Sequence, residues 1–187
     1  MKKILLFACL ASFLLSCTNS KEKGETSGGR DSTGMTDNKD KPAVDLPYTA
    51  SYSSSFSTDV SDADLKTALM SYKYWADADM KNLESTLADS VAVDFASGEH
   101  WSGTKTDLMK RWSTFRDSLS SVTIDMQGWQ KMYAADKKEG FVVTWYKEID
   151  TYKTGKADSA YYHDINQMKD GKIVWYAQYR RPAGFKK

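Results

Sequence analysis

Residues 159–180, SAYYHDINQMKDGKIVWYAQYR, indicate the fold class of this chain. Asp170-Gly171 stands between two runs of alternating apolar and polar residues, which is the strongest short-range signal of a two-residue β-hairpin. Such a turn places Lys169 opposite Lys172 and pairs each earlier residue with a later one on the same face of the sheet. The sequence therefore predicts that the chain closes in an antiparallel hairpin, which Pro182 ends.

Two further β segments are expected directly before this hairpin. Val122, Ile124 and Met126 alternate in a run that reaches residue 133, and a second run covers residues 141–152. Charged residues at 135–140 form the turn between them. Everything after residue 120 is therefore predicted to be a four-stranded antiparallel meander.

The chain before the meander has the periodicity of helices. Ser61 and Thr104 each precede an Asp three residues later, as in a capping box, and Asp79 is a candidate N-cap for a shorter helix. Apolar residues follow each cap at helical spacing. The predicted elements are helices at about 61–77, 79–87 and 104–119, a strand at 91–95 and a turn at 98–103. This order indicates an α+β fold.

The N-terminus has the features of an export signal with a lipid attachment site. Lys2 and Lys3 precede an apolar run over residues 4–15, which is too short to span a bilayer as a helix. The run ends in Ser16-Cys17, which is similar to a bacterial lipobox. We therefore predict a signal peptide at 1–16, with Cys17 carrying the lipid that anchors the protein to a membrane.

A polar segment separates this cysteine from the aromatic-rich part of the chain. Residues 17–59 contain Ser, Thr, Gly, Lys and Asp with few aliphatic residues, so they are predicted to be a flexible tether, and the folded domain is expected at 60–187. Tyr48, Tyr52 and Phe56 are expected to dock weakly on the domain. We expect a cell-envelope location, with the outer membrane favoured and the domain in the periplasm or at the surface.

Composition argues against several kinds of function. The formal net charge is +1, with 26 basic and 25 acidic side chains, so no nucleic-acid partner is expected. His100 and His163 lie on different predicted elements without carboxylates at ligand spacing, so no metal site is expected. No glycine-rich phosphate loop follows a strand, and no cofactor is expected.

The order of elements resembles the NTF2-like superfamily, in particular its SnoaL-like members. The resemblance covers about residues 61–181 and includes the helix end LESTLADSVAV at 83–93 and the hairpin DGKI at 170–173. It implies an NTF2-like cone, in which three N-terminal helices pack on a curved antiparallel sheet around a deep pocket. Members of this superfamily often form dimers through the outer face of the sheet.

The hairpin register yields two candidate inner faces. One carries Gln167/Val174, Ile165/Tyr176, His163/Gln178 and Tyr161/Arg180, and the other carries Met168/Ile173, Asn166/Trp175, Asp164/Ala177 and Tyr162/Tyr179. Resemblance to steroid-isomerase-like members favours the first face and puts His163 where those enzymes keep a proton-donating acid. The predicted pocket residues are His163, Gln178, Tyr161, Tyr176, Arg180, Tyr72, Trp75, Trp112 and Phe95.

A general base is missing from the position that the resemblance indicates. Phe95 aligns with the inward-facing carboxylate of the isomerase-like members, whereas Asp94 is one position away and would face the other side. We therefore expect a binding domain for a small, partly apolar molecule rather than an enzyme. Two alternatives stay open: an isomerase, cyclase or hydrolase that uses Asp94 and His163, and an interaction or homodimerisation module whose outer face carries Tyr162, Trp175 and Tyr179.

Overall fold

The computed structural model describes residues 45–184. The predicted signal peptide at 1–16, Cys17 and the tether as far as residue 44 lie outside the described residues. The described elements are β1 (Phe56–Ser57), α1 (Asp62–Ala76), α2 (Met80–Thr86), β2 (Leu87–Asp94), β3 (His100–Thr104), α3 (Lys105–Arg116), β4 (Leu119–Ala134), β5 (Glu139–Tyr152), β6 (Ala157–Lys169) and β7 (Lys172–Pro182). In this part of the chain no helix is long and apolar enough to cross a membrane.

The three predicted helices begin at the predicted caps. The Ser61 hydroxyl accepts a hydrogen bond from the backbone N–H of Asp64 at 3.0 Å. Asp79 and Thr104 accept equivalent bonds, at 3.1 and 3.2 Å, from the backbone N–H groups three residues later. Each cap satisfies a donor that the first helical turn leaves unpaired, which explains why helix starts are well determined by local sequence.

The sheet is larger than the predicted meander. Its seven strands lie in the order β1-β4-β5-β6-β7-β2-β3, and β2 runs parallel to β7 while the other neighbours are antiparallel. The predicted turn at 98–103 is wrong in part, because β3 pairs with β2 from Asp94↔His100 to Ser90↔Thr104. The predicted α+β class is confirmed, with a mixed rather than a wholly antiparallel sheet.

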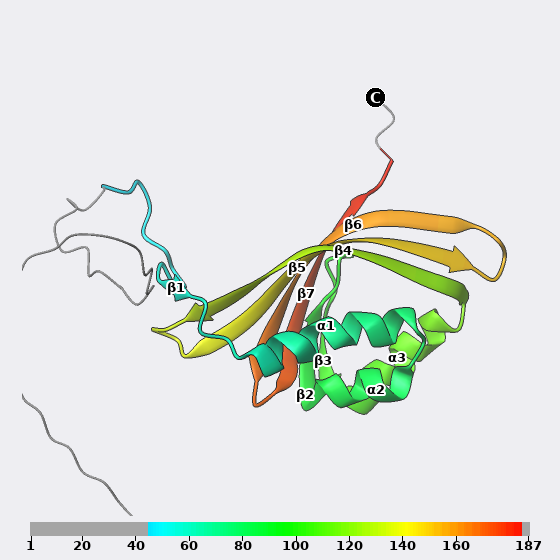
Figure 1. Cartoon of the computed structure of the whole chain (residues 1–187), viewed down its shortest axis with the longest axis horizontal. Coiled ribbons are helices and arrows are strands. Elements are labelled where there is room, and N and C mark those ends of the chain that lie inside the picture. The colour runs from blue at the N-terminus through cyan, green and yellow to red at the C-terminus, as the bar shows by residue number, and fades with distance from the viewer. Residues whose placement is uncertain (1–44, 185–187) are drawn as a thin grey trace, which may run out of the picture. The chain divides into compact units, whose positions relative to one another are not determined.

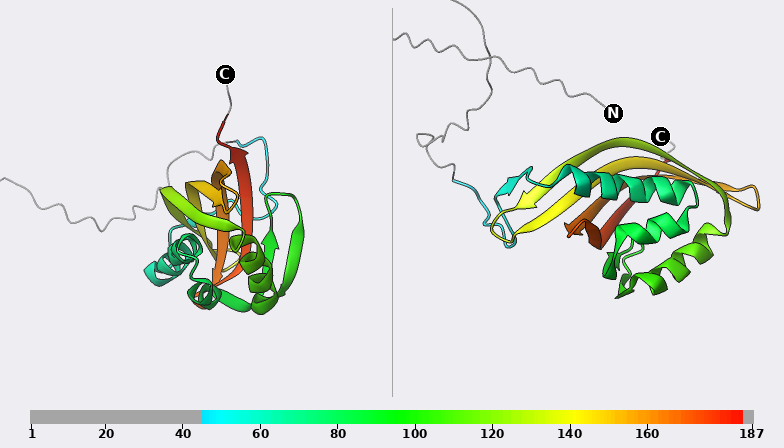
Figure 2. Two further views of the ribbon diagram at one scale, coloured as in Figure 1. Left: turned by 90° about the vertical axis from the view of Figure 1, so that its right-hand side faces the viewer. Right: turned by 60° about the horizontal axis from the view of Figure 1, so that its bottom comes forward.

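All three helices lie on one side of this curved sheet, as Figures 1 and 2 show. The core between the helices and the sheet includes the fully buried Leu108, Val93 and Val142. Toward the turn between β5 and β6 the long strands extend past the helix ends (Figure 1).

The β6–β7 hairpin contains a bulge that its sequence does not reveal. Asp170 and Gly171 have φ values of 51° and 75°, as the predicted two-residue turn requires, and Lys169 pairs with Lys172. Met168 pairs with Ile173, but the next pair is Gln167↔Trp175, which leaves Val174 as an extra residue. From Trp175 onward, β7 is therefore shifted by one position relative to the predicted register.

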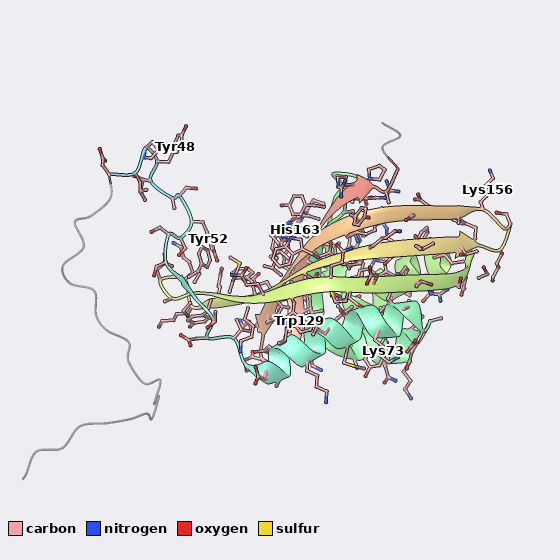
Figure 3. All side chains as sticks on the ribbon, turned by 45° about the horizontal axis from the view of Figure 1, so that its top comes forward. Tyr48, Tyr52, Lys73, Trp129, Lys156 and His163 are labelled. Carbon is pink, nitrogen blue, oxygen red and sulfur yellow. The ribbon has the colours of Figure 1, made fainter. Side chains whose placement is uncertain are left out.

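Contacts with the sheet begin before the expected domain boundary at residue 60. β1 pairs with β4 through Phe56↔Ala134, and the Tyr52 hydroxyl donates a hydrogen bond to Glu139. The ring of Tyr52 also packs edge-on against Phe141, with 6.3 Å between centroids. Tyr48 is 88% exposed, and Figure 3 shows it farther from the sheet than Tyr52. Docking of this segment thus involves Tyr52 and Phe56 rather than Tyr48.

Candidate ligand pocket

A cavity of about 430 Å³ lies between the inner face of the sheet and the helices. Nearly half of its lining residues are aromatic, and they come from α1, α3 and the long strands. Such a volume and an apolar wall with a few polar groups are typical of small-molecule sites. The rings of Trp75 and Trp112, 6.5 Å apart and edge to face, form part of the wall without filling the space.

Seven of the nine predicted pocket residues line this cavity. The aromatic ones are Tyr72, Trp75, Phe95, Trp112 and Tyr176, and the polar ones are Gln178 and Arg180. Whether they bind a ligand stays a prediction. The other two, His163 and Tyr161, are absent from the lining, so their predicted place in the pocket is wrong.

His163 and Tyr161 lie on the outer face of the sheet. The imidazole of His163 stacks on Trp145 at 5.0 Å between centroids and lies 5.9 Å from Tyr179. Figure 3 shows it on the side of the sheet turned away from α1. The Val174 bulge shifts β7 by one residue relative to β6, so Tyr176, Gln178 and Arg180 lie opposite Asn166, Asp164 and Tyr162 instead of Ile165, His163 and Tyr161.

Asp164 occupies the inner side of β6 beneath the cavity. It is fully buried, and one of its carboxylate oxygens, Oδ2, accepts hydrogen bonds from the hydroxyls of Tyr146 at 2.8 Å, Tyr176 at 3.0 Å and Tyr72 at 3.2 Å. The other oxygen, Oδ1, has no hydrogen-bond partner among the described residues. Burial raises the pKa of Asp164 to about 7, although the three tyrosine hydrogen bonds oppose this shift.

Polar side chains extend this network to the cavity. The Asn166 amide donates to the Tyr72 hydroxyl at 2.9 Å and to the Val142 carbonyl oxygen at 3.1 Å. The Gln178 amide donates to the Tyr176 hydroxyl at 2.6 Å. Because each of these hydroxyls already donates to Asp164, the network holds the tyrosine rings in fixed positions along the cavity wall.

Two more acidic residues line the cavity from β5. Glu148 and Asp150 are each 7% exposed and lie two positions apart, so both side chains point inward. Burial, followed by repulsion from Asp150, raises the pKa of Glu148 to about 8, and burial also raises the pKa of Asp150. The pair therefore holds a proton near neutral pH.

The outer part of the cavity carries paired charges. Arg180 donates to Asp158 at 2.5 Å, and Arg111 forms two hydrogen bonds of 2.6 Å with Glu99 while its guanidinium lies 4.4 Å from the ring centroid of Phe95. Asp158 and Phe115 are partly exposed, so this end is accessible to solvent.

Asp94, the base of the enzymatic alternative, lies outside the cavity. Its carboxylate accepts hydrogen bonds from His100 at 2.6 Å and from the Trp175 indole at 2.8 Å, and it does not line the cavity. The hydrogen bond from His100 is the main cause of its lowered pKa. Asp94 and His163 both lie on the face of the sheet opposite the cavity.

Three acidic residues that line the pocket, Glu148, Asp150 and Asp158, were not among the predicted site residues, and neither was Asp164 beneath it. In sequence they look like polar residues of a solvent-facing strand side, because alternation identifies two faces without telling which one is covered. Tyr146 gives a sequence signal for the inner face of β5: it is a large aromatic residue two positions before Glu148, and residues two apart in a strand lie on the same face. Among residues 45–184, no three His, Cys, Asp or Glu side chains are grouped as a metal site would need.

Solved structures share this architecture. AusH from Aspergillus nidulans matches with a TM-score of 0.53 and 16% identity, over 68% of this chain and 89% of that one. An LEH-like epoxide hydrolase of M. tuberculosis matches with a TM-score of 0.55 and 8% identity, over 64% and 84%. An NTF2-like protein from Anabaena variabilis matches with a TM-score of 0.52 and 17% identity, over 68% and 96%.

The matches define the class of the domain as an α+β cone of three helices on a curved sheet. The chain has the NTF2-like fold, as predicted. No family model and no curated protein matches the sequence. At these identities the likeness shows the fold alone, because one fold supports many activities.

Proposed function

We propose that this chain is a lipid-anchored protein of the bacterial cell envelope whose NTF2-like domain binds a small, partly apolar molecule without transforming it. The observation that carries the binding role is the cavity of about 430 Å³ with its largely aromatic wall. Tyr72, Tyr146 and Tyr176 are held by Asp164 before any ligand arrives. Fixed walls of this kind reduce the entropy cost of binding.

The anchoring part of the proposal rests on the N-terminal sequence. Ser16-Cys17 after a short apolar run is the basis for lipidation, and the polar residues that follow separate the lipid from the domain. The outer membrane is the favoured location. The absence of a catalytic step is supported by Asp94 and His163, the two groups that the enzymatic alternative requires, since neither lines the cavity.

Tryptophan fluorescence tests the binding role directly. The full chain in lipid nanodiscs is titrated with a panel of hydrophobic metabolites, and a ligand is expected to quench emission from Trp75 and Trp112 and to raise the melting temperature. Trp112→Phe should reduce the quenching, whereas Trp129→Phe, a change outside the cavity wall, should not. No thermal shift and no quenching across the panel would contradict the proposal.

A second candidate function is self-association through the outer face of the sheet. Trp145 is 37% exposed and Tyr179 59% exposed, and they flank His163 in a ladder of rings. Tyr162, expected on this face, lines the cavity instead, and the Trp175 indole is bonded to Asp94. The proposed partner is a second copy of this chain. In a two-fold symmetric dimer each chain contributes the same patch, so one patch of exposed rings is enough to form the interface.

Light scattering distinguishes this candidate from a monomer. The double variant Trp145→Ala/Tyr179→Ala should convert a dimer into a monomer, whereas Trp129→Ala should leave the mass unchanged, because Trp129 is exposed but lies outside the ladder. A wild-type chain that stays monomeric at high concentration would remove this candidate.

A further inference from the structure

Two buried carboxyl groups of the cavity lack a cationic partner. Glu148 and Asp150 are each 7% exposed and both line the cavity. The two carboxyl groups share a proton, and apart from this contact Asp150 Oδ1 has no hydrogen-bond partner among residues 45–184. Burying ionised carboxyl groups without a cation beside them is costly, so their position in a cavity wall indicates a cation that comes from a ligand.

The cations near this pair are already engaged elsewhere. Arg180 is bonded to Asp158 and Arg111 to Glu99. Arg116, which is buried behind the cavity, donates to the carbonyl oxygens of Trp75 and Ala76 at 3.0 Å each. Its charge lowers the pKa of Asp150 at a distance, but no ion pair joins it to either carboxyl group in the described part of the chain.

Aromatic rings surround the same space. Trp75 stacks on Phe115 at 6.1 Å between centroids and meets Trp112 edge to face. Tyr152 and Tyr162 line the cavity from the strands that carry or adjoin the carboxyl pair. Electron-rich ring faces combined with carboxylates are the usual environment for ammonium groups, because the ring quadrupole attracts a cation that is removed from water.

We propose that the ligand carries a positively charged amine on an apolar or aromatic body, and that Asp150, with Glu148 beside it, binds the amine. This inference rests on the proposed binding function. The ammonium group forms an ion pair with the carboxyl pair, which lines the cavity, and the ligand body packs against Trp75, Trp112 and Phe115. A neutral ligand of the same shape brings no positive charge to the carboxyl pair, so it binds more weakly.

The carboxyl pair also provides a second readout of amine binding. The shared proton is retained because two buried charges repel each other, and a bound cation removes that repulsion. The charged groups around the pair are Arg116, Arg180, Asp158 and Asp164. Because the pKa of Glu148 is raised to about 8, amine binding at pH 7 should release a proton to the buffer, and binding of a neutral ligand should not.

Isothermal titration with three matched probes tests the inference. The probes are 2-(1-naphthyl)ethylamine, 2-(1-naphthyl)ethanol and 1-naphthylacetate, titrated into the full chain in zwitterionic nanodiscs, with empty nanodiscs as the blank. At pH 7 the amine should bind at least tenfold more tightly than the alcohol, with the carboxylate weakest. Its heat should depend on the ionisation enthalpy of the buffer, which reports the released proton.

Three variants locate the effect. Asp150→Asn should weaken amine binding about tenfold and leave alcohol binding within twofold, and Glu148→Gln should abolish proton release. Asp125→Asn removes the same charge from an exposed position on β4 and should change neither. If Asp150→Asn does not fold, two measurements still test the amine proposal. They are the comparison of amine with alcohol on the wild type and the proton release of the Glu148→Gln variant.

The outcomes separate this inference from the function on which it rests. Equal binding of amine and alcohol, or tightest binding of the carboxylate, overturns the amine proposal and leaves a ligand-binding pocket. Failure of all three probes to bind overturns both.

Discussion

Asp164 is buried completely although it is a carboxylate, and three tyrosine hydroxyls converge on one of its oxygens. Burial opposes ionisation while the hydroxyl donors favour it, and burial prevails, so the pKa is raised to about 7 from an ordinary value of 3.8. His163, the residue before it in the chain, has none of these contacts. At the scale of one residue, the face of the strand therefore determines the chemistry.

The raised pKa of Asp164 predicts a pH-dependent stability. A carboxyl group whose pKa is higher in the folded state stabilises the fold fully below about pH 4, and this contribution is lost as pH rises toward 7. The slope is at most about 1.4 kcal/mol per pH unit for one group. Asp164→Asn should therefore flatten the loss of unfolding free energy between pH 5 and pH 7, measured by urea denaturation.

Glu148 contributes a similar loss up to about pH 8, so the profile of Asp164→Asn should be flatter than that of the wild type but not level. Asp125→Asn, on the exposed side of β4, is the matched control and should follow the wild-type curve. A profile for Asp164→Asn that coincides with the wild type would contradict the assignment of the shift to this residue.

At the scale of an element, the single extra residue in β7 controls the composition of the pocket wall. Deleting Val174 would remove the bulge and turn Tyr176, Gln178 and Arg180 to the outer face. The expected cost is about 3 kcal/mol of unfolding free energy or more, as for other changes that empty a core. Val174→Ala, which keeps the bulge, should cost about 1 kcal/mol or less. Equal denaturation midpoints for the two variants would refute this role.

The start of α1 offers a smaller effect at the same scale. Ser61→Ala removes the acceptor for the Asp64 backbone N–H, which is bonded at 3.0 Å. A loss of about 1 kcal/mol is expected from chemical denaturation. Ser61→Asp restores an acceptor and should recover most of the loss. A loss that persists in Ser61→Asp would show that the hydroxyl acts in another way.

At the scale of the whole molecule, the proposed function joins a membrane anchor to a pocket through a polar segment. Cys17→Ser should leave the domain folded but prevent lipid attachment and cleavage before residue 17, because no sulfur is available for the lipid. Mass spectrometry and extraction from membranes measure both effects. A variant with unchanged mass of the mature chain and unchanged membrane association would refute lipidation at Cys17.

Local sequence determined the parts of this protein that depend on neighbours in the chain. The helix caps at Ser61, Asp79 and Thr104 and the turn at Asp170-Gly171 lie where predicted, since each is a contact over two or three residues. Together they define the order of elements and therefore the fold class.

Only the tertiary structure decided which side of each strand faces the cavity. Alternation along residues 159–168 is compatible with either side, and the choice depends on strands and helices far away in sequence. Asp164 rather than His163 lies on the inner side of β6, the Val174 bulge places Tyr176 and Gln178 on the same side, and pairing with β2 brought residues 100–104 into the sheet. The physical reason is that the register of a strand depends on which of its two faces is buried. That choice is made by contacts with distant strands and helices, so a short stretch of sequence does not contain it.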